Sequence, residues 1–389
     1  MRIPGFTSTG SKRPEAQFGT GAPPGLPVKM ARASGAEVWD VEGRRYLDLI
    51  MALGAVALGY GHPAVNAAAH AAIDAGVVGP LPPEAEERLA ERLAGLMPWM
   101  ERTRFLKTGA EAVVAALRLA RAATGREAVL RCGYHGWLDW CQPVGSPGVP
   151  HQTFGLSEAI RFNDTDAGRG SIRRHAGRLA AVIVEPIVEG APSAEWLAML
   201  REETRAVGAL LILDEIKTGF RVSTGGAAQV YGIAPDLVVL GKAMANGFPL
   251  AAVGGRREVM DQARRTWISS TLATEMVALA AAEATVDVMV REEVPAYLAR
   301  MGARLQTGCE RLALRHPGLI SAAPGVPTMC FLRWTTEAIG SQVARAMAAR
   351  GILFKRSAYN FVSLAHDATM IDRVLAELDE VCASLPPTG

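Results

Sequence analysis

Residues 180–215 read AAVIVEPIVEGAPSAEWLAMLREETRAVGALLILDE, and this stretch decides the fold. The runs at 180–184 and 209–213 contain only apolar residues, and a stretch of helical composition at 194–206 separates them. Strands that are apolar on both faces and alternate with helices are typical of a parallel sheet covered on both sides. We therefore predict an α/β fold.

Two further runs, DLVVL at 236–240 and LAAVG at 250–254, extend the predicted sheet. The segment AEAVVAALRLARAA at 110–123 has no Gly or Pro and ends before Gly125, which predicts a helix. Further helices are predicted at 274–289, 294–314 and 369–384, with a strand at 328–333. Residues 1–35, rich in Gly, Pro and Ser, are predicted to form an irregular arm that leads into a hairpin turning at Glu42-Gly43.

The composition excludes some classes of partner. Among 389 residues, 41 Lys and Arg against 39 Asp and Glu give a net charge of +2, so no global field favours nucleic acid or an acidic membrane. The apolar run at 49–60 is too short to span a bilayer, and the polar N-terminus does not resemble a secretory signal, so we expect a cytoplasmic protein. The five cysteines lack metal-ligand spacing and are expected to be reduced core thiols.

Polar side chains follow three of the predicted strands: Glu185, Asp214 and Lys242. Ligands of parallel sheets bind outside the carboxyl ends of the strands, so these side chains are expected to share one cleft. Asp214 follows five apolar residues, and a buried carboxylate needs a cationic or donating partner; the alternative is a helix cap or an internal salt bridge. Lys242 would be a partly desolvated amine with a lowered pKa, or else a solvated loop charge.

Two other segments have a composition suited to one flat anionic ligand. Thr108-Gly109-Ala110 opens the helix at 110–123, where backbone N–H groups can bind an anion, although an ordinary helix cap has the same composition. The segment Gly133-Tyr134-His135-Gly136-Trp137 could present an aromatic face to a ligand or could pack in the core. His135 has no second ligand at i+3 or i+4, so no metal is expected, and nucleotide-binding glycine motifs are absent from the sequence.

Four motifs, TGAEA, GYHGW, DEIKTGFR and GKAMANGFPL, resemble those of the class III aminotransferases, which are pyridoxal phosphate (PLP) enzymes of fold type I. Within that family the chain looks similar to glutamate-1-semialdehyde aminomutase and to aminotransferases associated with polysaccharide and acidic-sugar biosynthesis. The resemblance implies a large domain at 55–290 with a mostly parallel seven-stranded sheet. It also implies a small α/β domain built from 1–54 and 291–389, and a homodimer with shared active sites.

The resemblance also implies roles for individual residues. Lys242 would hold PLP as an imine and Asp214 would pair with the pyridine nitrogen. Tyr134 and Ile216 would cover the two faces of the ring, with Glu185 and His135 beside it. The phosphate would be bound by Thr108, Gly109 and Ala110 and by Thr271 from the neighbouring subunit. The chain departs from the family pattern at Ala110, where a hydroxyl residue is usual, and after Thr271, where glycines are usual.

The implied reaction moves an amino group between a small-molecule donor and a keto or aldehyde acceptor, which could be sugar-like or carboxylated. The same groups could serve an aminomutase, a racemase or epimerase, or a protein that binds PLP without catalysis. Candidate substrate contacts are Arg13, Trp137 and Lys355, of which the two cations could anchor a carboxylate and Trp137 could form an apolar wall; solvated surface charges and core packing are the alternatives.

Overall fold

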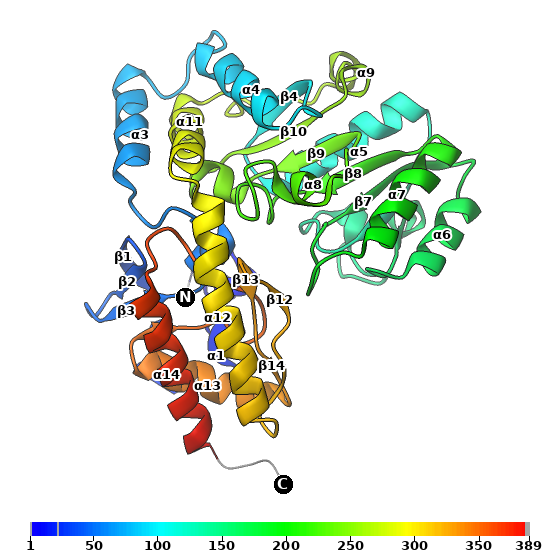
Figure 1. The fold of residues 1–389 in the computed structure, drawn as a ribbon. Coiled ribbons are helices and arrows are strands. Elements are labelled where there is room, and N and C mark those ends of the chain that lie inside the picture. The colour runs from blue at the N-terminus through cyan, green and yellow to red at the C-terminus, as the bar shows by residue number, and fades with distance from the viewer. Residues whose placement is uncertain (1, 22, 386–389) are drawn as a thin grey trace. The chain divides into compact units, whose positions relative to one another are not determined.

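The computed structural model describes residues 2–21 and 23–385 (Figure 1). The chain forms two compact units. One comprises residues 1–63 and 293–389, and the other comprises residues 64–292. The predicted division placed the first boundary at 54/55 and the second at 290/291. Within the described residues, no helix combines the length and the apolar character needed to cross a membrane.

Residues 64–292, all of them described, contain a seven-stranded sheet with the order β4-β10-β9-β8-β7-β5-β6. Its strands are β4 (Arg102–Leu106), β5 (Ala128–Cys132), β6 (Ser157–Ala159), β7 (Leu179–Val184), β8 (Leu210–Asp214), β9 (Leu237–Leu240) and β10 (Ala251–Gly255). The neighbours from β9 through β8, β7 and β5 to β6 are parallel. The prediction of an α/β fold with a mostly parallel sheet is confirmed.

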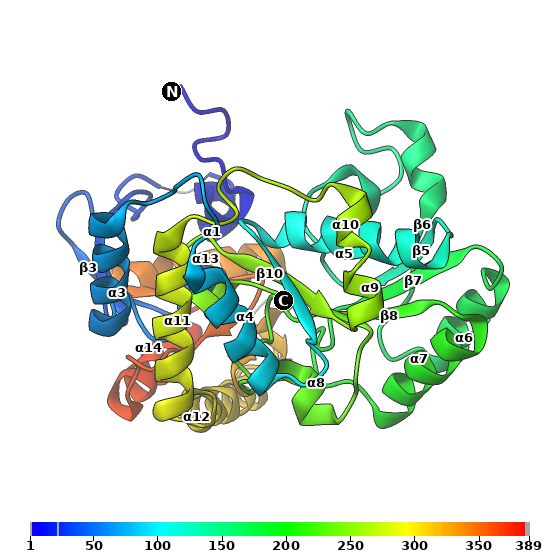
Figure 2. The ribbon, with the colours of Figure 1, turned by 90° about the horizontal axis from the view of Figure 1, so that it is seen from above.

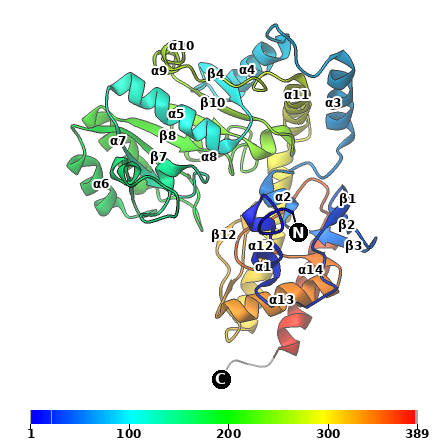
Figure 3. The same cartoon turned by 180° about the vertical axis from the view of Figure 1, so that it is seen from behind.

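Helices cover both faces of this sheet, which explains why its strands are apolar on both sides. On β7, Ala181 and Ile183 pack in one core with α5 (Gly109–Thr124), whereas Val182 and Val184 pack in the other with α7 (Ala194–Val207). Figure 2 shows α5 on one side of the strands and α7 on the other, and α5 stands in the foreground of Figure 3. The remaining α-helices of this unit are α3 (Pro63–Ala75), α4 (Glu84–Leu96), α6 (Thr165–Arg174), α8 (Gly226–Tyr231), α9 (Arg257–Met260), α10 (Ala263–Thr266) and α11 (Met276–Arg291), and its 3-10 helices are η2 (Asp139–Cys141), η3 (His151–Leu156) and η4 (Lys242–Ala245).

One strand runs against the others. β10 is antiparallel to both β9 and β4. Only residues 241–250 connect β9 to β10, and a parallel crossover needs a dozen or more residues, so the chain has to turn back. β4 itself was not predicted, because its sequence RTRFL contains two arginines and gives a weak strand signal.

The other unit is built around the long helices α12 (Val294–Arg315), α13 (Glu337–Ala349) and α14 (Ala368–Ser384). The predicted hairpin is present as β2 (Glu37–Asp40) and β3 (Arg45–Asp48), and it lies in a four-stranded sheet of order β1-β2-β3-β15. The shorter elements are α1 (Pro14–Phe18), β1 (Met30–Ser34), α2 (Met51–Gly54), β11 (Ile320–Ala322), β12 (Gly325–Val326), β13 (Met329–Cys330), β14 (Arg333–Trp334), β15 (Ile352–Leu353) and β16 (Asn360–Phe361).

Two local predictions for this unit were wrong. Residues 1–35 are not wholly irregular, because α1 and β1 lie within them. The single strand predicted at 328–333 is divided: β13 pairs with β12 and β16, whereas β14 pairs with β11. All five cysteines are described, and each is a buried free thiol.

Candidate active site

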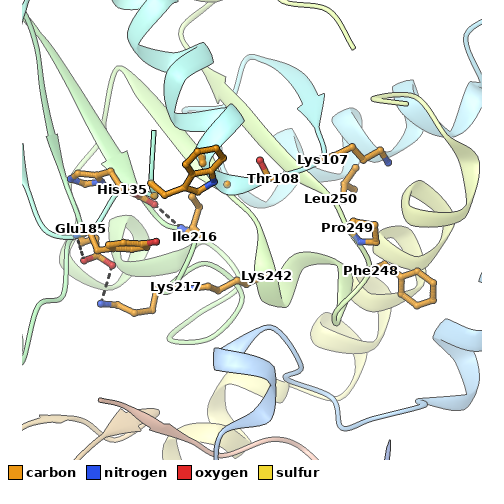
Figure 4. A pocket seen from close by; sticks show the side chains of 16 residues that line it. Lys107, Thr108, His135, Glu185, Ile216, Lys217, Lys242, Phe248, Pro249 and Leu250 are labelled. Atoms are coloured by element: carbon orange, nitrogen blue, oxygen red, sulfur yellow. Dashed lines mark hydrogen bonds and ion pairs between the residues drawn. The ribbon is translucent and has the colours of Figure 1, made fainter. Parts of the chain in front are cut away.

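A cavity of about 310 Å³ lies where β7 and β8 end and where α5 begins (Figure 4). It gathers side chains that lie far apart in the sequence and come from several loops. The lining residues are Lys107, Thr108, Gly109, Ala110, Tyr134, His135, Gly136, Trp137, Glu185, Asp214, Ile216, Lys217, Lys242, Phe248, Pro249 and Leu250. The three polar residues predicted to share a cleft therefore line one cavity.

Asp214 is the last residue of β8 and is buried. Its Oδ2 lies 2.7 Å from Nδ1 of His135, and its Oδ1 accepts a hydrogen bond from the backbone N–H of Ile216. Within the described residues, Nε2 of His135 has no hydrogen-bond partner. The ring of His135 stacks on buried Trp140, with centroids 5.9 Å apart, and this packing holds the imidazole in place. An ionised carboxylate has about four lone-pair sites, so Asp214 keeps capacity for a further cationic donor.

Lys242 opens the short 3-10 helix Lys242–Ala245 after β9 and has a φ of 46°. A lysine in the left-handed region costs about 1–2 kcal/mol, and such strain is concentrated at functional sites. Burial lowers the pKa of Lys242; the cations Lys217 and Arg221 lower it further, whereas Glu185 and Asp214 act in the opposite direction. Lys242 is therefore a partly desolvated amine inside the cavity rather than a solvated loop charge.

The start of α5 has the features of an anion site. Thr108 caps the helix in a capping box with Glu111, so its hydroxyl is engaged with that side chain and with the backbone N–H of Glu111. The first N–H groups of an α-helix have no carbonyl partner within the helix. Those of Gly109 and Ala110 are in this position and are therefore available to an anion. A Cβ atom at Gly109 would lie 2.6 Å from Cδ1 of Ile216, so glycine allows this close approach.

Tyr134 and Trp137 lie on the cavity wall with 70% and 73% of their surface exposed, so neither ring packs in the core. The backbone between them is held by a glycine with positive φ, Gly136, whose added Cβ would lie 2.8 Å from that of Ala110. The N–H of Tyr134 donates to Oε2 of Glu185 over 2.8 Å. The two aromatic side chains are thus free to contact a ligand.

Two lysines in the cavity were not singled out from the sequence. Lys217 pairs with Glu185, with 3.0 Å between Nζ and Oε1. Lys107 pairs with Glu275, with 2.7 Å between Nζ and Oε1, and Glu275 also caps α11. The position of Lys217 three residues after Asp214 was visible in DEIKTGFR, but the sequence does not show which way a loop side chain points.

Three predicted site residues do not line this cavity. Thr271 is exposed in the same unit. Arg13 and Lys355 belong to the other unit; Arg13 is exposed, and Lys355 is buried and donates from Nζ to the backbone carbonyl of Ser11. Over residues 2–21 and 23–385, no group of three His, Cys, Asp or Glu side chains is arranged to bind a metal ion.

Comparison with known proteins places this geometry in one family. The family model "Aminotransferase class-III" matches residues 20–384. The glutamate-1-semialdehyde 2,1-aminomutase of Thermomicrobium roseum is 36% identical over 90% of this chain and 89% of its own length.

Solved structures agree with this placement. A structure of the FumI protein of Sphingopyxis sp. MTA144 that contains PLP is 30% identical, with a TM-score of 0.88 over 94% of this chain and 92% of that one. The β-phenylalanine aminotransferase of Variovorax paradoxus is 27% identical, with a TM-score of 0.88 over 100% of this chain and 93% of its own.

Proposed function

The chain belongs to the class III aminotransferase family, and we propose that Lys242 is the residue to which its pyridoxal phosphate cofactor is covalently attached. The enzyme is a PLP-dependent transaminase that acts on small molecules. The observation that carries the assignment of Lys242 is its position: its amine has a lowered pKa and lies in one cavity with Asp214 and the start of α5.

The residues of the cavity fit PLP. The N–H groups of Gly109 and Ala110 would hold the phosphate, and Asp214 would hold the proton on the pyridine nitrogen. Tyr134, with its exposed ring, and Ile216 would cover the two faces of the ring. Thr108 lines the cavity, but its hydroxyl is engaged in the capping box, so we expect it to contribute less to the phosphate site than the two backbone groups.

When bound, PLP supplies an electron sink for the carbanion that forms beside the amine nitrogen. The protein itself contributes the groups that hold or move protons. Burial lowers the pKa of Nζ of Lys242 and so favours the uncharged form that can react with a carbonyl carbon, with loss of water; once a substrate amine has displaced it, Nζ would take up and return the proton of the carbon that bears the nitrogen. His135 fixes Asp214 in one orientation, so that its carboxylate faces the cavity as an acceptor.

An exposed apolar patch supports a homodimer. The patch consists of Val77, Val78, Leu81, Trp267 and Leu272, which are 43% to 88% exposed. One hydrogen bond links the segment after Leu272 to the first three residues, because the N–H of Met276 donates to the carbonyl of Val77. Exposed large apolar side chains are typical of protein interfaces when a partner covers them. We propose that a second copy of the chain covers this patch and that the exposed Thr271 beside it reaches the phosphate in the partner's site.

A second candidate activity is that of an aminomutase, because the Thermomicrobium relative has that function in its name. The two activities differ in their need for a co-substrate. A transaminase retains the donor's nitrogen and needs a separate carbonyl acceptor to return to its starting form. An aminomutase returns the nitrogen to the same molecule, so we expect turnover with one substrate alone.

The test is the visible absorption spectrum of the protein loaded with PLP, followed by a panel of amino donors and then keto, aldehyde and sugar-like acceptors. We expect the wild type to show a visible band that one donor removes and one acceptor restores. Borohydride reduction followed by peptide mass spectrometry should place the cofactor's mass on Lys242. A label on Lys217 or Lys107, the other lysines of the cavity, would contradict the assignment, and Lys242→Ala should lose both the band and the label.

A further inference from the structure

Glu185 and Lys217 form a nearly buried ion pair within the cavity (Figure 4). Nζ lies 3.0 Å from Oε1, and the two side chains keep only 9% (Lys217) and 11% (Glu185) of their surface exposed. Glu185 follows β7, and Lys217 follows the neighbouring strand β8. Such a pair loses hydration that water would supply, so each partner depends on the other for its charge to be tolerated.

The second carboxylate oxygen of Glu185 holds the loop that carries the aromatic ring. Oε2 accepts the backbone N–H of Tyr134 over 2.8 Å. Gly133, with a φ of 106°, allows this approach, because a Cβ atom there would lie 2.6 Å from Oε2. Glu185 is therefore held between Lys217 on one side and the backbone at Tyr134 on the other.

The ion pair also determines which charges surround Lys242. Burial lowers its pKa most strongly; Glu185 and Asp214 raise it, and Lys217 and Arg221 lower it. If Lys217 lost its charge, Glu185 would keep a buried carboxylate whose remaining cationic neighbours include Lys242. The positive charge of Lys217 would no longer oppose a positive charge on Lys242, and the negative charge of Glu185 would be left to attract one. Both changes would favour protonation of the Lys242 amine.

We propose that Lys217 is a positioning residue that acts through Glu185: it holds the backbone at Tyr134 against the cavity and keeps Glu185 from pairing with Lys242. The first part concerns the protein alone. The second part rests on the proposed function, because it matters only if Lys242 reacts with a carbonyl compound.

The first measurement is amide hydrogen exchange of residues 133–137 in the protein without PLP. Lys217→Met removes the charge at similar length, and we expect exchange at the Tyr134 amide to become about tenfold faster or more, since a hydrogen bond to a charged group is lost or weakened. Lys217→Arg should restore most of the protection. Arg173→Met is a matched control, because Arg173 pairs with the buried carboxylate of Glu203 in the same unit but outside the cavity.

The positioning role is overturned if Lys217→Met exchanges at the wild-type rate, if Lys217→Arg does not restore protection, or if Arg173→Met accelerates the same amide equally. Should Lys217→Met fail to fold, the double variant Glu185→Gln/Lys217→Met removes both charges together. The glutamine oxygen can still accept a hydrogen bond from the N–H of Tyr134, but no cation holds the side chain in place. Faster exchange of that amide than in the wild type supports the proposal, and exchange at the wild-type rate contradicts it.

The second measurement is the rate at which the visible band grows when PLP is added, as a function of pH. Attack requires an uncharged amine, so the rate rises with pH through the pKa of Lys242. In Lys217→Met the rise should move to higher pH than in the wild type, because both changes favour the protonated amine. An unchanged profile contradicts the second part of the proposal. If the wild type forms no band, the proposed function fails instead, and hydrogen exchange still decides the positioning role.

Discussion

Gly109→Ala tests whether the start of α5 and the loop after β8 are packed as tightly as the structure indicates. The added methyl would lie 2.6 Å from Cδ1 of Ile216, and 3.4 Å from its Cγ1 and Cγ2. Carbon atoms pack favourably at about 3.5–4.0 Å, so one atom has to move by roughly 1 Å. Cδ1 is the end of a flexible side chain, and Ile216 lines the cavity, so the movement that relieves the clash pushes Ile216 into the cavity.

Overpacking a well-packed site costs about 1–3 kcal/mol. If Ile216 moves into the space that the ring would occupy, this cost appears in binding, and the apparent dissociation constant of PLP rises by about 5- to 140-fold, at 1.4 kcal/mol for each factor of ten. If Ile216 stays in place, the cost appears in the free energy of unfolding of the protein without PLP. Titration of PLP followed by absorbance therefore measures the part of the cost that weakens binding, and urea unfolding measures the part that lowers stability.

The double variant Gly109→Ala/Ile216→Val is the internal check. Valine lacks Cδ1 and keeps the two carbons at 3.4 Å, so affinity should return to within a few-fold of the Ile216→Val single variant. Gly95→Ala, at a helix position with no atom within 4 Å of the added methyl, should leave PLP binding unchanged. Wild-type affinity and stability in Gly109→Ala, or no recovery in the double variant, would refute the packing argument.

Other predictions concern different parts of the protein. Gly133→Ala should lower stability in urea unfolding by about 2–3 kcal/mol more than Gly125→Ala. Both glycines have positive φ, but only at Gly133 would the added methyl meet Glu185, at 2.6 Å, and disturb its charge-assisted hydrogen bonds. Equal losses of stability in the two variants would count against this. Burial raises the pKa of Glu215 from 4.5 to about 7, although Thr218 and the N–H groups of Ala227 and Ala228 oppose the shift. As pH rises, the carboxyl group of Glu215 loses its proton at lower pH in the unfolded state than in the folded state. The stability of the wild type relative to Glu215→Gln should therefore fall by about 3 kcal/mol between pH 4.5 and 7 and stay constant at higher pH. A stability difference that does not change with pH would contradict the burial argument. Trp267→Glu should shift the protein toward monomer in sedimentation experiments, whereas Leu314→Glu, at an 83% exposed position outside the patch, should not.

The site illustrates how far sequence patterns reach. Asp214 and Lys242 could be found because Asp214 directly follows an apolar run, Lys242 follows another after a single glycine, and the carboxyl ends of parallel strands meet at one edge. Lys217 could not be found in this way: it lies in a loop, where no periodicity fixes the direction of a side chain. Its pairing with Glu185 joins residues 32 positions apart, and neither residue indicates the other in the sequence.

The candidate substrate residues show what charge alone leaves open. Arg13 and Lys355 were singled out because a carboxylate anchor needs a cation, but charge alone does not place a residue. Lys355 is buried, and its ammonium donates a hydrogen bond to the backbone carbonyl of Ser11 within its own unit. Arg13 is exposed there. Their part in substrate binding stays a prediction.

The sequence by itself determined the layers of this protein, because apolar runs that need cover on both faces leave few arrangements other than a parallel sheet between helices. It also determined the chemistry at the strand ends, since a carboxylate and an amine in such surroundings must be paired or used. The tertiary structure alone decided the reversal of β10, the tight contact of Gly109 with Ile216 and the pairing of Glu185 with Lys217. These features depend on the length of a connection and on distances between side chains from different elements, which local sequence patterns do not encode.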